Sequence, residues 1–442
     1  MNRNASLFTL DGTPKPAQIL ALALQHVVAM IAGCVTVPLL VSNASGISPA
    51  DSIALIQACL FCSGISILLQ VLPWFKGIGA KLPLITGASF VFLPAYMAIG
   101  KEFGLGTVFG GQLVGGICAV LFGFLLTKIH SLFPPIVTGT IITTIGLSLC
   151  TTAINYMAGG EGSTNYGSVQ NWILALLTMV IVFVCTHFGK GFLKLASILI
   201  GIVVGYGIAL ALNMIDFQSV AGASWVQTPM PLHFGMEFEF SAVLTIVFVS
   251  LVQSIEVIGD ITSTTTGGLE RQPETQELRG GIIANGIISG VGSLFGGIAM
   301  GTYSQNVGIV ITTKTVNRKI FITAGGIVIL AGLIPKLSAL FTTIPQCVLG
   351  GAIVAVFGSI TMTGIRLIAQ QEMNGRNMAI VGLAIIIGMG VVLAPQSLVG
   401  LPVWLRTLFG TSAVVLSGTI STILNLILPE AEGEKELSKR GE

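Results

Sequence analysis

The stretch Gly301–Lys314, GTYSQNVGIVITTK, is polar in its first half although it lies deep in an apolar chain. An unbroken polar run covers Thr302–Asn306, with a glycine just before it. In a bilayer every backbone N–H and C=O needs a partner, so irregular backbone is tolerated only where protein or a watery cavity surrounds it. The stretch predicts a short extended piece and then a half-helix starting near Gln305 or Asn306. The positive end of that half-helix would face a ligand at mid-membrane.

The composition is that of a membrane protein. Of 442 residues, 53% are hydrophobic and only 9% are charged, whereas soluble domains carry about 25% charged residues. The net charge of +2 is too small to indicate a nucleic-acid partner. The seven cysteines lie in apolar stretches and lack metal-like spacing beyond the pair Cys59 and Cys62, so we predict that they form neither a disulfide nor a metal site. We expect an all-α polytopic protein embedded in lipid.

Apolar stretches of about 20 residues, long enough to cross a bilayer, recur along the chain. We predict fourteen spans, near 17–41, 50–71, 82–100, 107–127, 135–157, 171–187, 194–214, 240–260, 279–298, 300–314, 319–337, 346–368, 377–394 and 404–428. If the chain begins in the cytoplasm, every Lys and Arg except Lys101, Lys336 and Arg406 falls on the inner side. Basic residues collect on that side of membrane proteins, so both termini are predicted to be cytoplasmic.

The chain repeats itself. The heptapeptide at 133–139, FPPIVTG, has a counterpart at 344–350, IPQCVLG, and each opens a long apolar helix. Gly87–Phe90 (GASF) precedes Gly301–Gln305 (GTYSQ) by nearly the same spacing. Seven spans per half is an odd number, so the second half must be inverted. An inverted repeat with short strands and half-helices in its third and tenth spans is typical of a secondary transporter with its site between them.

Two carboxylates in the eighth predicted span are the first candidates for function. Glu256 and Asp260 stand in SLVQSIEVIGDITS, four residues apart and so on one helix face. An ionisable group inside a span costs about 2.5–3.5 kcal/mol on insertion scales, which makes each a candidate by default. Two acids so close in a medium of low dielectric constant are not both expected to be ionised, so at least one should hold a proton. Proton coupling requires a carboxyl of this kind, which can be neutral or charged near physiological pH. The alternative for Asp260 is a place at the cytoplasmic end, where it orients a neighbour.

Two further polar residues lie inside spans. His26, in the first span, either touches a ligand or locks two helices together, because neutral imidazole donates and accepts. Asn285, in the ninth, stands beside glycines that permit close helix approach, and we expect it to brace the site.

Together these motifs carry a family resemblance. With Gln305–Gly308 (QNVG) before Thr313 and Lys314, Gln25 and His26 in the first span, and the acid pair in the eighth, the chain resembles the nucleobase–ascorbate transporter family of nucleobase–cation symporters. The resemblance covers nearly the whole chain, including the loop AGGEGSTNYGS at 158–168. It implies two inverted sevens, a homodimer, and a proton as the coupling ion with no other cofactor. It also implies a core domain (17–127 and 240–337) and a gate domain (135–214 and 346–428).

The resemblance also implies roles for single residues. Glu256 would bind two edge N–H groups of a base, and Gln305 a carbonyl and a ring nitrogen. Phe90 would stack on the ring, and the backbone N–H of Ser89 or Phe90 would cap another oxygen. The residues expected to support the site and its proton linkage are Asp260, Asn306, His26 and Asn285.

Different residues of the chain favour different substrates. Asn285 stands where xanthine and urate members commonly carry aspartate, and both it and Ser89 resemble a uracil-transporting branch. Gln305 is the purine-like choice, and Glu256–Asp260 (EVIGD) matches xanthine members better. We therefore expect a proton-coupled importer of xanthine first and uric acid next, in the bacterial inner membrane.

Three other functions stay open at this point. One is a uracil permease of the same family. Another is an anion transporter on the same plan, which would need a basic or neutral site and is opposed by Glu256. The third is an enzyme, but the spans contain no metal triad and no nucleophile with its base.

Overall fold

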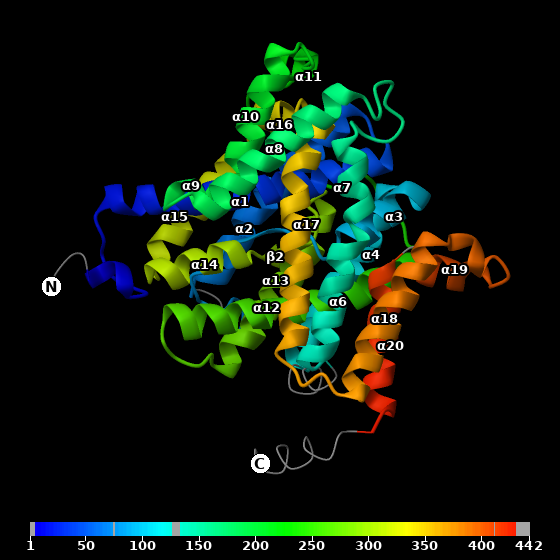
Figure 1. The fold of residues 1–442 in the computed structure, drawn as a ribbon. Helices are drawn as coiled ribbons and strands as arrows, with labels where there is room; N and C mark the ends of the chain where they lie inside the picture. Colours follow the sequence, from blue (N-terminus) through cyan, green and yellow to red (C-terminus); the bar gives the residue numbers. More distant parts are fainter. Residues whose placement is uncertain (1–4, 74–75, 126–132, 411, 430–442) are drawn as a thin grey trace. The chain divides into compact units, whose positions relative to one another are not determined.

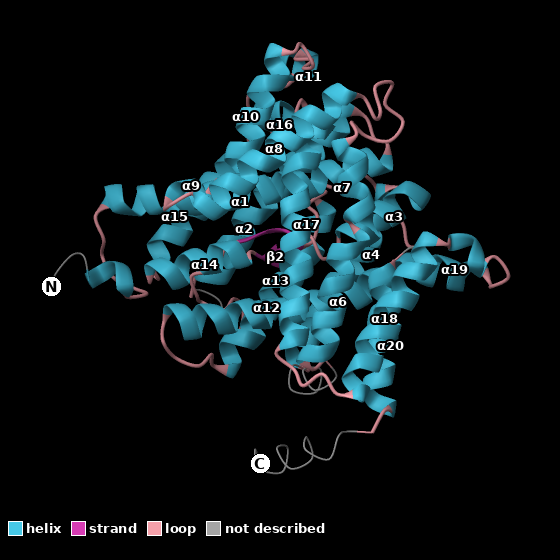
Figure 2. Ribbon diagram, viewed as in Figure 1, coloured by secondary structure: helices cyan, strands magenta, loops and turns pink. Residues whose placement is uncertain are grey.

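The computed structural model describes residues 5–73, 76–125, 133–410 and 412–429. The chain is almost entirely helical (Figures 1 and 2). Its elements before the middle loop are η1 (Ala5–Phe8), α1 (Pro16–Ser45), α2 (Pro49–Val71), β1 (Thr86–Ala88), α3 (Leu93–Phe103), α4 (Leu105–Phe124), α6 (Pro135–Ser148), α7 (Cys150–Met157), α8 (Val169–Phe188), α9 (Phe192–Leu195), α10 (Ser197–Ala211) and α11 (Gln218–Gly222). Those after it are α12 (Phe240–Gly268), α13 (Thr275–Leu294), β2 (Met300–Thr302), α14 (Ser304–Thr313), α15 (Arg318–Gly332), α16 (Pro335–Thr342), α17 (Gln346–Ala369), α18 (Gly375–Leu393), η2 (Pro395–Leu398), α19 (Val403–Gly410) and α20 (Ala413–Ile427).

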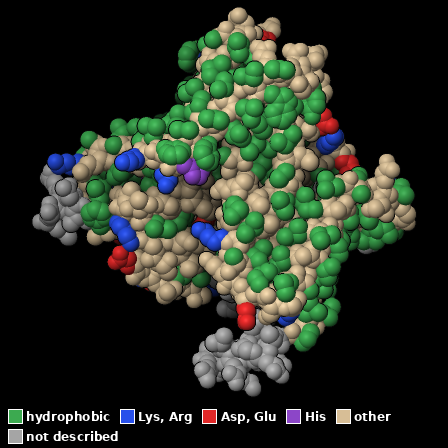
Figure 3. Space-filling model, in the orientation of Figure 1, with side chains coloured by type: hydrophobic (Ala, Val, Ile, Leu, Met, Phe, Trp, Pro, Cys, Tyr) green, Lys and Arg blue, Asp and Glu red, His purple; other side chains and the backbone are tan. Residues whose placement is uncertain are grey.

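The described helices confirm a polytopic membrane protein. Eight candidate spans are long and apolar enough to cross a membrane, and the bent pair α15 and α16 would make a ninth. Large apolar side chains on α8 face outward, with Ile173, Val180 and Phe183 each about half exposed. On the face drawn in Figure 3 hydrophobic side chains predominate and charges are few. Such a surface suits lipid, whereas the count of fourteen spans stays a prediction.

The chain divides into two compact units, residues 1–126 with 152–355 and residues 127–151 with 356–442. In the first unit α2 packs on α1 and α15, and α4 packs on α12 and α13. In the second unit α6, α18 and α20 pack on one another. The division into core and gate domains with the boundaries given above stays a prediction.

Glycines bring α4 and α13 into backbone contact. A Cβ on Gly116 would lie 2.5 Å from the backbone N of Gly290 and 2.7 Å from the carbonyl O of Gly286. Real Cβ atoms do not approach other atoms so closely, so only glycine fits at Gly116. Small residues at helix crossings are how membrane helices gain van der Waals contact.

Two short strands lie among the helices of the first unit, drawn in magenta in Figure 2. They are antiparallel, and their register pairs Thr86 with Thr302 and Ala88 with Met300. Each strand leads into a short helix, α3 or α14, and α14 begins at Ser304. The prediction of an extended piece and a half-helix in the third and tenth spans is confirmed, with α14 starting one residue earlier than expected. An antiparallel pair from matching positions is what an inverted repeat requires. The repeat of seven spans plus seven inverted spans itself stays a prediction.

The segment before α1 is attached to the link between α14 and α15. Asn317, fully buried in this link, has its Nδ2 within 3.0–3.1 Å of the carbonyl oxygens of Ser6, Thr9 and Gly12. Its Oδ1 accepts from the backbone N–H of Lys319 at 3.1 Å and so caps α15. One side chain therefore joins the N-terminal segment to the helix that follows the half-helix.

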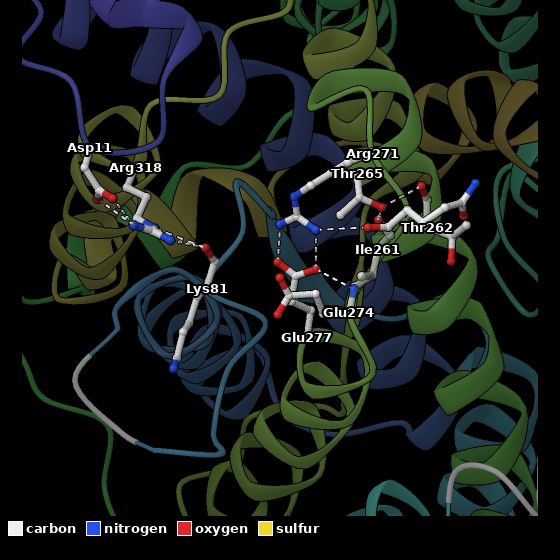
Figure 4. A network of polar contacts seen from close by, with 10 residues as sticks. Asp11, Lys81, Ile261, Thr262, Thr265, Arg271, Glu274, Glu277 and Arg318 are labelled. Carbon is white, nitrogen blue, oxygen red and sulfur yellow. Dashed lines mark hydrogen bonds and ion pairs between the residues drawn. The ribbon is translucent and has the colours of Figure 1, made fainter.

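Arg318 strengthens the same attachment (Figure 4). Its guanidinium donates to both carboxylate oxygens of Asp11, at 2.5 and 2.7 Å, and to the carbonyl O of Lys81. The planar guanidinium suits such two-point recognition. A second cluster in Figure 4 pairs Arg271 with Glu277 at the start of α13. Charged groups of the first unit thus gather at helix ends.

We expect Asn317→Ala to destabilise the protein by about 2–3 kcal/mol, because it removes a helix cap and the hydrogen bonds to three carbonyls of the N-terminal segment. The measurement is thermal unfolding of the detergent-solubilised protein. Asn374→Ala is the control, since Asn374 caps α18 through its Oδ1 at 2.8 Å from the N of Asn377. The control should cost about 1 kcal/mol. Equal losses in the two variants would contradict the attachment.

Candidate functional site

The two strands are held by a tyrosine that crosses them. Tyr303 donates from its hydroxyl to the carbonyl O of Ala88 at 3.0 Å, and its backbone N–H donates to the carbonyl O of Ile85. A Cβ on Gly87 would lie 2.8–3.0 Å from three atoms of the Tyr303 phenol. Gly87 therefore lets the ring lie flat on β1, which fixes the start of α14 relative to the end of β1.

Gly87→Ala should reduce transport, because the Tyr303 phenol is tied to Ala88 and cannot move aside cheaply. Overpacking of this kind costs about 1–3 kcal/mol. The measurement is substrate uptake per molecule of protein in the membrane. Gly326→Ala is the control, since Gly326 lies on α15 and a Cβ there meets nothing within 4 Å. Equal uptake by the two variants would contradict this role for Gly87.

Phe90 lies just beyond β1 and is partly exposed. A Cβ on Gly33 of α1 would lie 3.3 Å from Cε2 of Phe90. The ring thus packs against α1, and the residue is partly exposed. This placement suits the stacking role expected for it.

Asp260 is bound to the start of the half-helix α14. Its Oδ2 accepts from the hydroxyl of Thr302 at 2.5 Å, and its Oδ1 accepts from the hydroxyl of Ser304 at 2.8 Å. A carboxylate near a helix N-terminus is electrostatically favourable. Asp260 is 6% exposed, so it is a buried link between α12 and α14. The alternative of an orienting residue matches these contacts, although its role in proton linkage stays a prediction.

Glu256 lies one turn before Asp260 on α12 and is partly buried. Its Oε2 accepts from Nε2 of Gln253 at 2.9 Å. In the described part of the chain neither Glu256 nor Asp260 forms an ion pair, because the ion pairs involve other acids. The expected carboxylate pair is therefore in place without a basic partner.

Ser89 faces inward rather than toward open space. It is 3% exposed, its backbone N–H donates to the carbonyl O of Ala299 at 3.0 Å, and its hydroxyl donates to Oε1 of Gln253. The hydroxyl oxygen also accepts from the backbone N–H of Val91 at 3.2 Å. Of the two backbone groups expected to cap a ligand oxygen, the one on Ser89 is already engaged.

Asn306 and His26 connect α14 to α1. Nδ2 of Asn306 lies 3.0 Å from the carbonyl O of His26 and 3.2 Å from its Nδ1. The imidazole packs against the ring of Phe321, with centroids 4.6 Å apart. Asn306 is 1% exposed, and within the described residues its Oδ1 has no hydrogen-bond partner. His26 is thus placed to join α1 to α14, which is one of the two roles expected for it.

Gln305 points away from Asn306. It is exposed, and its Nε2 reaches the carbonyl O of Ala29 at 3.3 Å, a long hydrogen bond. Adjacent residues of a helix point about 100° apart, so one faces the protein and the other the open side. Gln305 is available to a ligand at small cost.

Asn285 lies on α13, one turn from Ser289, whose hydroxyl oxygen accepts from the backbone N–H of Met300 in β2. It is 5% exposed, and its Oδ1 is without a partner among the described residues. Asn285 therefore lies on the helix whose Ser289 binds β2. Among the described residues the structure shows no hydrogen bond from Asn285 to the other candidates.

The structure thus brings most predicted residues around the two strands and adds one that sequence reasoning missed. Gln253 bonds both Ser89 and Glu256 and is 1% exposed. The available signal was its spacing, since a polar residue three before Glu256 lies on the same helix face.

Comparison with known proteins agrees with this architecture. The model of the Xan_ur_permease family, described as a permease family, matches residues 17–397. The chain belongs to the nucleobase–ascorbate transporter family. It is 36% identical to a xanthine permease of Bacillus subtilis, over 92% of this chain and 93% of the relative. It is 35% identical to the uric acid permease PucJ of the same species, over 95% of this chain and 94% of the relative. As a member of a permease family, it is a membrane transporter and not an enzyme.

A solved structure shares the fold of this family member. The transmembrane domain of a cyanobacterial bicarbonate transporter, BicA, matches with a TM-score of 0.61 and 15% identity. The match covers 92% of this chain and 98% of that domain. At such low identity the likeness concerns the fold alone.

Proposed function

We propose that this transporter imports xanthine, with uric acid as the second candidate substrate, together with protons by alternating access. The observation that carries the proposal is the Glu256 carboxylate on α12. It lies one turn before Asp260, which bonds Ser304 at the start of α14, and it is joined through Gln253 to Ser89 just after β1. Gln253 binds Oε2 of this carboxylate, which leaves Oε1 to accept from a ligand N–H. An acceptor of this kind suits a planar base with N–H groups on its edge.

The other groups around the strands complete the recognition of an oxopurine. The exposed carboxamide of Gln305 supplies both a donor and an acceptor, as a neighbouring carbonyl and ring nitrogen require. The partly exposed ring of Phe90 offers a face for stacking. The names of the relatives support a purine base as substrate and do not favour uracil.

Proton coupling is assigned to the acid pair. Glu256 and Asp260 stand one turn apart, and Asp260 bonds the start of α14 directly. A change in protonation at this pair would alter the hold on the half-helix, which is how binding and movement become linked. We place the protein in the bacterial inner membrane as a homodimer with cytoplasmic termini, its core domain moving against its gate domain. A proton is the coupling ion, and no other cofactor is proposed.

The anion alternative rests on the shared fold with a bicarbonate transporter. An anion site would gain from a cation, yet the candidate site holds the carboxyl groups of Glu256 and Asp260, and an ionised carboxylate would repel a negative ligand. A neutral base is therefore the better fit.

The test is uptake of radiolabelled xanthine into cells expressing the chain, competed by uric acid, uracil, guanine and hypoxanthine, with and without a protonophore. The proposal expects accumulation that only oxopurines compete and that the protonophore abolishes. Accumulation of uracil in place of xanthine would overturn the purine assignment. Uptake that is insensitive to the protonophore would overturn the coupling.

A further inference from the structure

Gln253 occupies the centre of the hydrogen-bond chain that joins the two halves of the site. Its Oε1 accepts from the hydroxyl of Ser89, at the end of β1, and its Nε2 donates to Oε2 of Glu256 at 2.9 Å. It is 1% exposed, so both bonds are sheltered from solvent. No ligand can reach this side chain without displacing others.

When Glu256 is ionised, this hydrogen-bond chain has one consistent direction. The Ser89 oxygen accepts from the backbone N–H of Val91, so its own proton is free to point at Gln253. An ionised carboxylate cannot donate, so the amide nitrogen of Gln253 must face Glu256 and its oxygen must face Ser89. Reversing the amide would place an oxygen against a carboxylate oxygen and a nitrogen against a donor.

Gly301 makes room for this arrangement. A Cβ there would lie 2.9 Å from Nε2 of Gln253 and 3.0 Å from both Cβ and Oγ of Ser89. The pairing of β1 with β2 sets Gly301 opposite Gly87. The backbone of β2 therefore packs directly on the hydrogen bond between Ser89 and Gln253. Any side chain at position 301 would push these two residues apart.

We propose that Gln253 is a positioning residue that fixes the Glu256 carboxylate for the base, and that Ser89 acts through Gln253 rather than on the ligand. This inference rests on the proposed function. By holding Oε2, Gln253 selects one orientation of the carboxylate and leaves Oε1 directed to an N–H of the base. Ser89 in turn holds the amide of Gln253, so a change at β1 is felt at Glu256.

The test is a double-mutant cycle with Gln253→Met and Ser89→Ala, read as KM and maximal rate of xanthine uptake per molecule in the membrane. Methionine keeps the length of the side chain and removes both hydrogen bonds. We expect Gln253→Met to raise KM about tenfold or more, since a hydrogen bond to a charged group is lost. Ser89→Ala should raise KM in the wild-type background and have no further effect in Gln253→Met. Independent effects that multiply, or an unchanged KM in Gln253→Met, would overturn the proposal.

Gln70→Met is the matched control. Gln70 is also fully buried and makes two bonds, donating to the carbonyl O of Gly281 at 2.9 Å and accepting from the N–H of Ala80 at 3.1 Å. Its loss should lower the amount of folded protein and leave KM unchanged. A rise in KM as large as that of Gln253→Met would show a general packing effect and overturn the proposal.

A second variant keeps the test valid if Gln253→Met does not reach the membrane. Gln253→Glu keeps an acceptor for Ser89 and replaces only the donor to Glu256 by an acceptor. KM should rise while Ser89→Ala still has an effect, and a normal KM would overturn the role of Gln253. The proposed function is tested separately by Glu256→Gln. Its failure would show as normal uptake in that variant, whatever Gln253 does.

Discussion

Replacing Glu256 by Gln is expected to lower xanthine uptake about 100-fold or more while the protein still reaches the membrane. The substitution keeps the shape of the side chain, and its amide oxygen can still accept from Gln253. It removes the negative charge that a base N–H would meet, and it removes the group that would carry a proton. The measurement is initial uptake rate, normalised to the protein in the membrane.

Glu270→Gln is the matched control for the loss of a carboxylate. Glu270 lies in the loop after α12, where the hydrogen bond from Lys314 Nζ at 2.9 Å holds the pKa of its carboxyl below the usual value. That pair is exposed, and exposed ion pairs contribute little to stability because water screens them. Uptake by Glu270→Gln should equal that of the wild type. Normal accumulation by Glu256→Gln would sink the assigned role.

The interrupted helix at Gly301–Lys314 could be predicted because the rule behind it is strong. Backbone groups in lipid must find partners, so the polar run at Thr302–Asn306 could not be an ordinary span. The structure adds what supplies those partners, namely pairing with β1 and the bond from the backbone N–H of Tyr303 to the carbonyl O of Ile85. The pairing could be guessed only from the matched spacing of the two short spans.

The chain through Gln253 could not be predicted in the same way. Ser89 stands 164 residues before Gln253, and the two meet only because the strand register puts Ser89 next to Ala299 and α12. A one-residue slip would turn Ser89 to the other face. The sequence marks each residue as polar but does not mark the contact.

Two other residues show the same limit. Asn317 reads as an ordinary loop and helix-cap residue, yet it gathers three carbonyls from a segment more than 300 residues away in the chain. Asn285 reads as a bracing amide, yet within the described chain its oxygen lacks a partner. Polarity in an apolar span predicts importance, whereas long-range packing decides which partner is met.

Asn306→Ala is expected to reduce uptake about tenfold or more at fixed substrate concentration, with little change in the amount of protein. Nδ2 of Asn306 joins α14 to α1 through the carbonyl O and Nδ1 of His26. Among the residues that the structure describes, its buried Oδ1 has no hydrogen-bond partner, which costs free energy in this state. A group left unsatisfied in one state is one that another state, or a bound ligand or water, can satisfy. Alanine removes the hydrogen bonds from Asn306 to His26. It also removes the Oδ1 whose hydrogen bonding would differ between states.

The measurement for Asn306→Ala is KM and maximal rate of xanthine uptake, with Asn171→Ala as the control. Asn171 is similarly buried and donates through Nδ2 to the carbonyls of Ala158 and Asn165, at 3.0 and 2.8 Å. It holds a loop at the start of α8, which carries none of the candidate residues. Its loss should reduce the amount of folded protein and leave KM and the rate per molecule unchanged. If Asn306→Ala instead lowers only the amount of protein, Asn306 is a packing residue.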